Sequence, residues 1–306
     1  MSSCIKTTKH IWQTLQSGLI IPEGNITAIS DHVKTPFLSI KTKAEELEAL
    51  YSDSQIDLPP SCNLSNLIQN AKAYWEEWFT IQTDKLDMRM LFETLHLDRI
   101  ATAVLLLKDI EGKEKYLTAF ASGNLDFFKR EKSFAKNLLW EVEVWAQLYR
   151  KMPSVNLEEL PDIVIHFEDA KIGIACKKLY SEKHVQHVLS EAVHQIEDSF
   201  EFGIVALNID DLCPPDKLVK VSDRAGLDKF MQNLNGQFIQ RHERHLRKYL
   251  SSGRLISALI STNVVADIAT EHVRFNNASQ CDIWTIPGLP PTKHHQLGRF
   301  YHILMR

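Results

Sequence analysis

Residues 161–181, PDIVIHFEDAKIGIACKKLYS, constrain the fold most strongly, because two short apolar segments stand on either side of a polar turn. Apolar runs of this length, bounded by turn residues, are typical of strands. The segment therefore predicts a β-hairpin. A carboxylate, Asp162, lies at the start of its first strand, and Lys178 lies at the end of its second strand.

The residues around this hairpin alternate between helical and strand patterns. A helix is predicted before the hairpin and another after it, each with a serine at its start that can cap the first turn. The predicted order is helix 133–151, the hairpin, helix 181–200, strand 203–210, helix 225–250 and strand 254–262. Strands separated by helices indicate crossover connections, so we expect an α/β fold whose mixed sheet is covered on both faces.

The first part of the chain has a different pattern. Residues 66–82 and 88–110 have helical spacing, and no motif before residue 131 indicates a reaction. We therefore expect a helical N-terminal region, residues 1–130, that binds a protein partner or completes a cleft. The second region, residues 131–306, is expected to carry the chemistry, and residues 292–296, TKHHQ, are expected to form a polar loop.

The charge and cysteine content narrow the possible environments. A formal net charge of −4 argues against attraction of the whole protein to nucleic acid, although a local basic cleft stays compatible with it. The 5 cysteines are scattered without a CxxC pair, which favours reduced thiols over disulfides or a structural zinc site. The first residues lack a signal-peptide pattern, and the apolar run 101–107 is far shorter than the ~20 residues of a membrane span. A cytoplasmic location is expected.

One local basic cluster stands out. Arg241, Arg244, Arg247 and Lys248 fall within two turns of the predicted helix 225–250. Such a cluster can contact the phosphates of a nucleic acid. The alternative is an ordinary solvated helix face.

The hairpin brings polar side chains together. Side chains alternate along a strand, so Cys176 and Lys178 share one face while Lys177 points to the other. The spacing from Asp162 to Cys176 allows one strand, a tight turn and the return strand, which places the two residues at neighbouring strand ends. A carboxylate and an amine there can hold a divalent cation and position a water molecule. Lys177 is interpreted as a solvated charge or a phosphate contact.

The helix before the hairpin contains a carboxylate in an unusual position. Its predicted apolar stripe consists of Phe134, Leu138, Val142, Trp145 and Tyr149. Glu141 lies at the border of that stripe, whereas Glu143 lies outside it. An unpaired carboxylate on the core side of a helix is costly, so Glu141 needs a partner such as a metal ion or a lysine.

The helix after the hairpin supplies further polar candidates. Gln195 borders the apolar stripe of this helix, and His187, Glu191 and His194 share its polar face. Histidines and a carboxylate at this spacing can bind a transition metal. The alternative is a solvated helix face.

Taken together, this order of elements and residues resembles the PD-(D/E)XK nuclease superfamily. The resemblance covers roughly residues 133–262 and rests on a helix with a Glu, "PD" on a strand, x-x-Lys at the end of the next strand, and a helix with a Gln. It implies a restriction-endonuclease-like αβββαβ core. It also implies that Asp162 and Glu141 hold Mg²⁺ or Mn²⁺, that Lys178 orients the attacking water, and that Gln195 is an accessory polar group.

The sequence departs from this pattern at Cys176, where the superfamily has Asp or Glu. Because Mg²⁺ prefers oxygen ligands, Glu141, Glu191 or Glu168 would have to supply the missing carboxylate. The resemblance then implies an endonuclease acting on DNA, with RNA as an alternative substrate, in restriction or defence against foreign DNA. Many such enzymes cut duplexes as homodimers. Two alternatives stay open: an inactive module of the same fold that binds nucleic acid or a protein, and an unrelated α/β protein with a structural hairpin.

Overall fold

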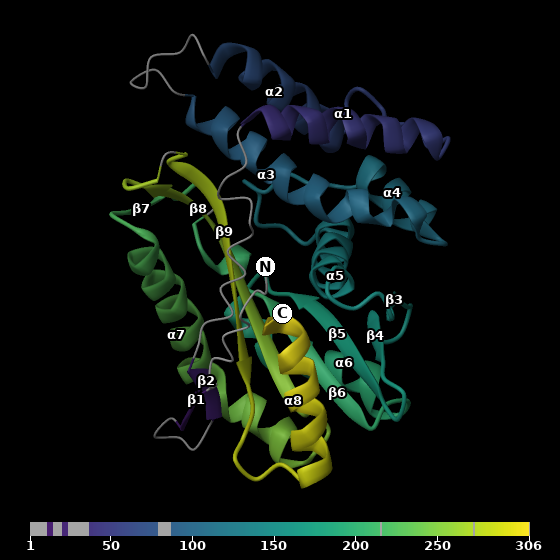
Figure 1. Cartoon of the computed structure of the whole chain (residues 1–306), viewed down its shortest axis with the longest axis vertical. Helices are drawn as coiled ribbons and strands as arrows, with labels where there is room; N and C mark the ends of the chain where they lie inside the picture. Colours follow the sequence, from purple (N-terminus) through teal and green to yellow (C-terminus); the bar gives the residue numbers. More distant parts are fainter. Residues whose placement is uncertain are drawn as a thin grey trace, which may run out of the picture.

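The structure is a computed structural model that describes residues 11–14, 20–23, 37–78, 87–214, 216–271 and 273–305. After two short strands, a group of helices precedes a mixed sheet that is interleaved with further helices (Figure 1). The chain is therefore an α/β protein, as the alternating patterns predict. No helix in the described ranges is both long and apolar enough to cross a membrane.

The N-terminal helices are α1 (Phe37–Asp53), α2 (Asn63–Trp78), α3 (Met88–Val104) and α4 (Lys113–Ser122), with a 3-10 helix (Leu105–Asp109) after α3. The predicted helices within residues 66–82 and 88–110 are thereby confirmed over the residues that the structure describes. The prediction of an entirely helical N-terminal region is wrong in one respect. Strands β1 (Ile11–Thr14) and β2 (Ile20–Glu23) pair antiparallel, and β2 lies against the C-terminal sheet.

The large sheet has seven strands in the order β3-β4-β5-β6-β8-β7, with β9 paired to the other edge of β8. These strands are β3 (Val155–Leu157), β4 (Ile163–His166), β5 (Lys171–Lys178), β6 (Phe202–Asn208), β7 (Val219–Val221), β8 (Ser257–Ile268) and β9 (Phe275–Trp284). Strands β5, β6, β8 and β7 run parallel, whereas β3, β4 and β9 pair antiparallel with their neighbours.

The predicted hairpin is confirmed as β4 and β5, with Ile163 opposite Ile174. Helix α5 (Phe134–Tyr149) precedes it, and α6 (Val185–Glu197) follows it and leads into β6. Ser133 caps α5 as predicted, since its hydroxyl accepts a hydrogen bond from the Lys136 N–H. Ser181 caps the 3-10 helix Glu182–His184 that precedes α6, since its hydroxyl accepts a hydrogen bond from the Lys183 N–H. The element order from α5 to β6 is therefore helix, three strands, helix, strand.

Helices pack on the sheet and join the two parts of the chain. Helices α5 and α6 both contact β5, α7 (Arg224–Ser251) covers β8 and β9, and α8 (Pro291–Met305) packs against α5. Helices α3 and α4 also contact α5, so one continuous apolar core runs from the N-terminal helices into the sheet (Figure 1). This packing positions the N-terminal helices beside the polar ends of the hairpin.

Three local predictions are wrong. Phe134 is 72% exposed instead of belonging to the apolar stripe of α5. Glu143 is buried, not outside the stripe, because Arg99 of α3 pairs with it. Residues 292–296 belong to α8 and not to a loop, since Leu297, Phe300 and Tyr301 anchor that helix in the core.

Candidate functional site

Polar side chains form two groups near the end of β5. The first group, which we call the acid pair, consists of Glu141 on α5 and Asp162 at the start of β4. The second, the Lys178 network, lies where β5 and β6 end. Because β5 and β6 are parallel with Lys178 opposite Asn208, their carboxyl ends meet at one edge of the sheet. The sequence predicts one combined site, and the structure separates its lysine from its carboxylates.

Asp162 is held by the hairpin itself. Its Oδ2 accepts a hydrogen bond from the Cys176 N–H at 2.6 Å, and its side chain is buried. Burial raises the pKa of Asp162, although the Lys177 charge and the Cys176 N–H both oppose this. The strand geometry that the sequence predicts therefore places Asp162 beside Cys176, as expected.

Glu141 lies close enough to Asp162 for the two charges to interact. Burial, and after it the charge of Asp162, raises the pKa of Glu141 to about 8. The ammonium groups of Lys177 and Lys115 act in the opposite direction on this pKa. Two carboxyl groups that repel each other in a low-dielectric setting form a site that a cation would stabilise.

Cys176 is a poor substitute for a metal-binding carboxylate. Burial, with further contributions from Asp162 and Glu141, raises the pKa of the Cys176 thiol well above its usual value. The thiol is then neutral at pH 7, and a neutral thiol is not a ligand for a hard cation. Cys176 therefore lies in the position that the sequence predicts but adds no ligand charge.

Lys178 contacts other groups. Its Nζ donates to the Asn208 Oδ1 at 2.7 Å and lies 3.0 Å from the Asp211 Oδ2, with the Asp210 carboxylate 3.9 Å away. The lysines whose charges act on both members of the acid pair are Lys177 and, to a smaller extent, Lys115. The structure thus places Asp162 in contact with Cys176, the charge of Glu141 acts on both, and Lys178 is directed to the end of β6.

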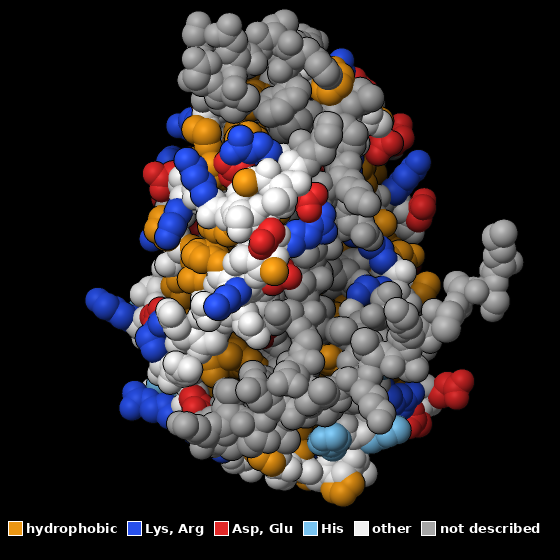
Figure 2. Space-filling view, turned by 60° about the vertical axis from the view of Figure 1, so that its left-hand side comes forward, with side chains coloured by type: hydrophobic (Ala, Val, Ile, Leu, Met, Phe, Trp, Pro, Cys, Tyr) orange, Lys and Arg blue, Asp and Glu red, His pale blue; other side chains and the backbone are white. Residues whose placement is uncertain are grey.

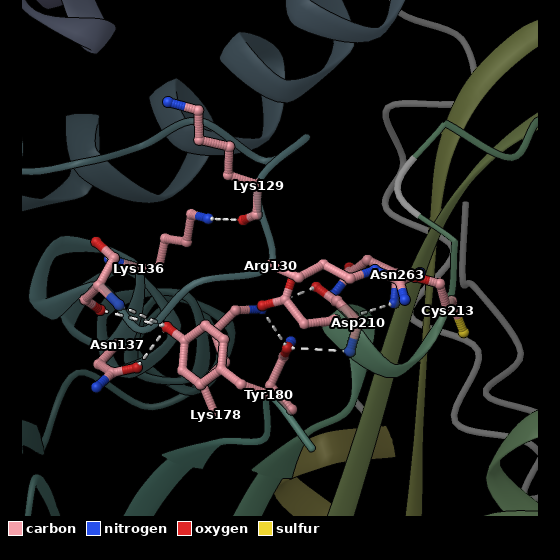
Figure 3. Close-up of polar contacts among 12 residues, drawn as sticks. Lys129, Arg130, Lys136, Asn137, Lys178, Tyr180, Asp210, Cys213 and Asn263 are labelled. Carbon is pink, nitrogen blue, oxygen red and sulfur yellow. Dashed lines mark hydrogen bonds and ion pairs between the residues drawn. The ribbon is translucent and has the colours of Figure 1, made fainter. Parts of the chain in front are cut away.

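The Lys178 network extends to α3 through Arg99. The Arg99 guanidinium binds both carboxylate oxygens of Glu143, and its Nη1 lies 2.9 Å from the Asp210 Oδ2. Asp210 also accepts a hydrogen bond from the Asn263 N–H at 2.7 Å (Figure 3). Although burial opposes it, the charges of Arg99 and Lys178 hold the pKa of Asp210 below its usual range. In this network, two cations compensate the charges of three carboxylates, those of Glu143, Asp210 and Asp211.

Tyr180 links Lys178 to the start of α5. The Tyr180 ring lies beside the Lys178 ammonium, and the Tyr180 hydroxyl donates to the Oδ1 of Asn137 on α5 at 2.9 Å (Figure 3). Lys136 is buried, and its Nζ donates to the Lys129 carbonyl at 2.6 Å. Burial lowers the pKa of Lys136. These contacts rigidify the start of α5, two turns before Glu141.

The other predicted site residues lie apart from both groups. The Gln195 side chain is half-buried on α6, and its Oε1 has no hydrogen-bond partner in the described ranges. His187 pairs with Glu191 at 3.3 Å on an exposed helix face. Glu168 is exposed beyond the far end of β4 from Asp162, so neither it nor Glu191 replaces the missing carboxylate. The described residues hold no group of three or more His, Cys, Asp or Glu side chains suited to a metal.

The predicted basic cluster lies on α7, and acidic side chains partly neutralise it. Arg241 pairs with Glu182, and Arg247 pairs with Glu243, while Arg244 donates to His245 and Lys248 lies over the Tyr249 ring. Figure 2 brings the α7 side of the molecule forward, and its Lys and Arg side chains are interspersed with Asp and Glu side chains. This face therefore has no extended area of one charge among the side chains that the figure colours.

The acid pair would suit Mg²⁺ or Mn²⁺ only if water molecules and substrate phosphates supplied the remaining ligands. Magnesium usually keeps several water ligands and is bound by one or two carboxylates together with substrate phosphates. Asp162 and Glu141 would offer two oxygen ligands to such a cation, which would remove the repulsion between them. A site with more protein ligands would need a carboxylate at position 176.

Sequence reasoning missed Arg99, Asp210, Asp211 and the role of Lys177. Asp210 and Asp211 follow the buried strand β6 directly, and polar residues after a buried parallel strand meet their neighbours at the same sheet edge. That position was a usable signal for the two aspartates. Nothing in the sequence links Arg99, which lies on a helix far away in the chain, to this edge.

The raised pKa of Glu141 predicts an unusual pH dependence of stability. The unfolded chain has a glutamate pKa near 4.3, so between about pH 4.5 and 8 only the folded state binds this proton. Because the folded state binds the extra proton, the free energy of unfolding of wild type decreases through Glu141 as the pH rises toward 8. Glu141→Gln is expected to remove this decrease, so the stability of the variant relative to wild type should rise with pH by up to about 1.4 kcal/mol per unit. Urea unfolding from pH 5 to 8 measures this, and parallel pH profiles would contradict it.

Comparisons of the chain with protein-family models, with curated proteins and with solved structures found no match.

Proposed function

We propose that the chain is a divalent-cation-dependent phosphodiesterase that cleaves DNA, built on a restriction-endonuclease-like core. One observation supports this proposal: in the order α5, β3, β4, β5, α6, β6, the charge of Asp162, directly before the second strand, acts on Glu141 of the preceding helix. This is the arrangement that the resemblance to PD-(D/E)XK nucleases implies. Restriction or defence against foreign DNA is the biological setting that goes with it.

Each residue near the acid pair has a role in this proposal. Asp162 and Glu141 would hold Mg²⁺ or Mn²⁺. A bound divalent cation lowers the pKa of a water molecule and neutralises charge on the phosphate. Lys177 is half-buried and acts on both carboxylates, so it is the better candidate to contact the phosphate or orient the water. Lys178, the lysine of the sequence motif, would instead keep the ends of β5 and β6 together.

A cleavage assay with the two neighbouring lysines tests the proposal. Supercoiled plasmid and circular single-stranded DNA are incubated with wild type, Lys177→Ala and Lys178→Met in Mg²⁺, in Mn²⁺ and in EDTA. We expect divalent-dependent cleavage by wild type and a loss of about tenfold to a thousandfold in Lys177→Ala, with an unchanged melting temperature. Lys178→Met leaves Asp211 buried without its partner, so its main effect is expected to be a lower melting temperature.

The outcomes separate the roles of the two lysines. Cleavage that survives Lys177→Ala and disappears in a folded Lys178→Met protein would return the catalytic role to Lys178. No cleavage of either DNA by wild type with any divalent cation would contradict the proposed activity.

A second candidate function is favoured by Cys176 and by the contacts of Lys178. A neutral thiol in place of a carboxylate and a lysine engaged by Asp211 and Asn208 suit a module of the same fold that binds nucleic acid without cutting it. Cys176→Glu distinguishes the two candidates. Cleavage that appears only in this variant would support the inactive module.

A further inference from the structure

The strongest feature outside the acid pair is an exposed aromatic side chain at the start of α5. Three large apolar side chains are exposed among the residues whose burial is described, namely Met88, Phe134 and Leu160, and Phe134 is the most exposed at 72%. An exposed phenylalanine gains nothing for folding, since its ring stays in water. Phe134 is therefore a surface feature that folding does not explain.

Phe134 lines a groove between α4 and the start of α5. The groove is lined by Lys115, Thr118, Ala119, Ser122, Gly123, Asn124, Ser133, Phe134 and Ala135. Its lining contains one cation and no carboxylate. The other side chains in it are small or uncharged, so the groove combines a positive charge with an aromatic face.

The groove shares one residue with the surroundings of the acid pair. Lys115, which lines the groove, acts electrostatically on both Glu141 and Asp162. Phe134 and Glu141 lie seven positions apart on α5, which brings them onto nearly the same face at a separation of about 10 Å along the helix axis. A stacked nucleic-acid strand advances about 3.4 Å per nucleotide, so this separation corresponds to roughly three nucleotides.

We propose that this groove binds single-stranded DNA, with an unpaired base stacked on Phe134 and a phosphate near Lys115, so that the strand reaches the acid pair. Aromatic side chains beside a cationic groove are the usual means of holding single strands without sequence preference. A paired base inside a duplex has no free face for Phe134. The inference rests on the proposed function and names its substrate as single-stranded or frayed DNA.

Binding measured in EDTA tests the groove separately from catalysis. Fluorescence anisotropy compares a labelled oligothymidine 12-mer with the same strand in a duplex. Wild type is expected to bind the single strand at least about fivefold more tightly. Phe134→Ala should weaken single-strand binding about tenfold, and Phe134→Trp should retain it, because stacking on an aromatic ring contributes roughly that factor. Lys115→Ala should weaken binding and reduce its dependence on salt.

Met88→Ala is the matched control, because it removes an exposed apolar side chain that does not line the groove. Equal binding by wild type and Phe134→Ala overturns the inference, as does a preference for the duplex or binding of neither DNA. Since Phe134 is exposed, the melting temperature of Phe134→Ala should stay within about 1 °C of wild type, which keeps the comparison valid. Phe134-dependent binding in a protein that cleaves no DNA would support the groove and contradict the proposed activity.

Discussion

Arg99→Met is expected to lower the free energy of unfolding by about 3–5 kcal/mol, because it leaves Glu143 without its cation and Asp210 with only the more distant Lys178. Arg99 binds Glu143 through two nitrogens and Asp210 through a third, and all three side chains are almost fully buried. Methionine fills a similar volume, so the change removes mainly charge. Urea unfolding at pH 7 measures the loss.

Arg89→Met is the matched control for this experiment. Arg89 also pairs with a glutamate, Glu93, but its side chain is 68% exposed. Exposed pairs of this kind contribute only about 0–1 kcal/mol. Similar losses in the two variants would contradict the view that the Lys178 network stabilises the sheet edge through buried charge compensation.

The second large effect is expected at Asp162. Asp162→Asn keeps an oxygen that can accept the Cys176 N–H, so the hairpin should stay folded. It removes one of the two proposed metal ligands, and cleavage is expected to fall by a factor of about 100 or more, since metal stabilisation is worth several kcal/mol. The rise in melting temperature that a bound cation causes in wild type should also disappear.

Asp162→Asn is expected to reduce cleavage but not to reduce the stability of the metal-free protein. Without the Asp162 charge, the pKa of Glu141 should fall, and the variant should be at least as stable as wild type at pH 8 without metal. Asp198→Asn, which changes an exposed aspartate at the end of α6, serves as the control. Full cleavage by Asp162→Asn would contradict the role assigned to the acid pair.

The hairpin and the unusual position of Glu141 could be predicted because they depend on local patterns, whereas the pairing of Glu141 with Asp162 was implied only by the family resemblance. The strand alternation placed Cys176 and Lys178 on one face, and the helical projection marked Glu141 as a carboxylate near the core. The contact of Asp162 with Cys176 follows from the length of the hairpin. These relations involve residues in neighbouring elements, so short-range geometry was sufficient.

Other elements could not be predicted for specific reasons. Strand β9, FNNASQCDIW, is rich in polar residues, and it is a strand because β8 pairs with it along ten residues. Strands β3 and β7 have 3 residues each, too few for a periodic signal. The periodicity of α5 could not show that α3 would supply Arg99 to Glu143, or that the first turn would leave Phe134 in water.

The amino-acid sequence was sufficient to predict the alternation of helices and strands, the hairpin and the core-side position of Glu141, since these follow from side-chain periodicity and short loops. Only the tertiary structure shows that Lys177 acts on the acid pair, whereas Lys178 joins the network of Asp210, Asp211 and Arg99. This difference depends on how β6 and α3 are positioned relative to β5. Long-range packing sets those positions, and no local pattern in the chain encodes them.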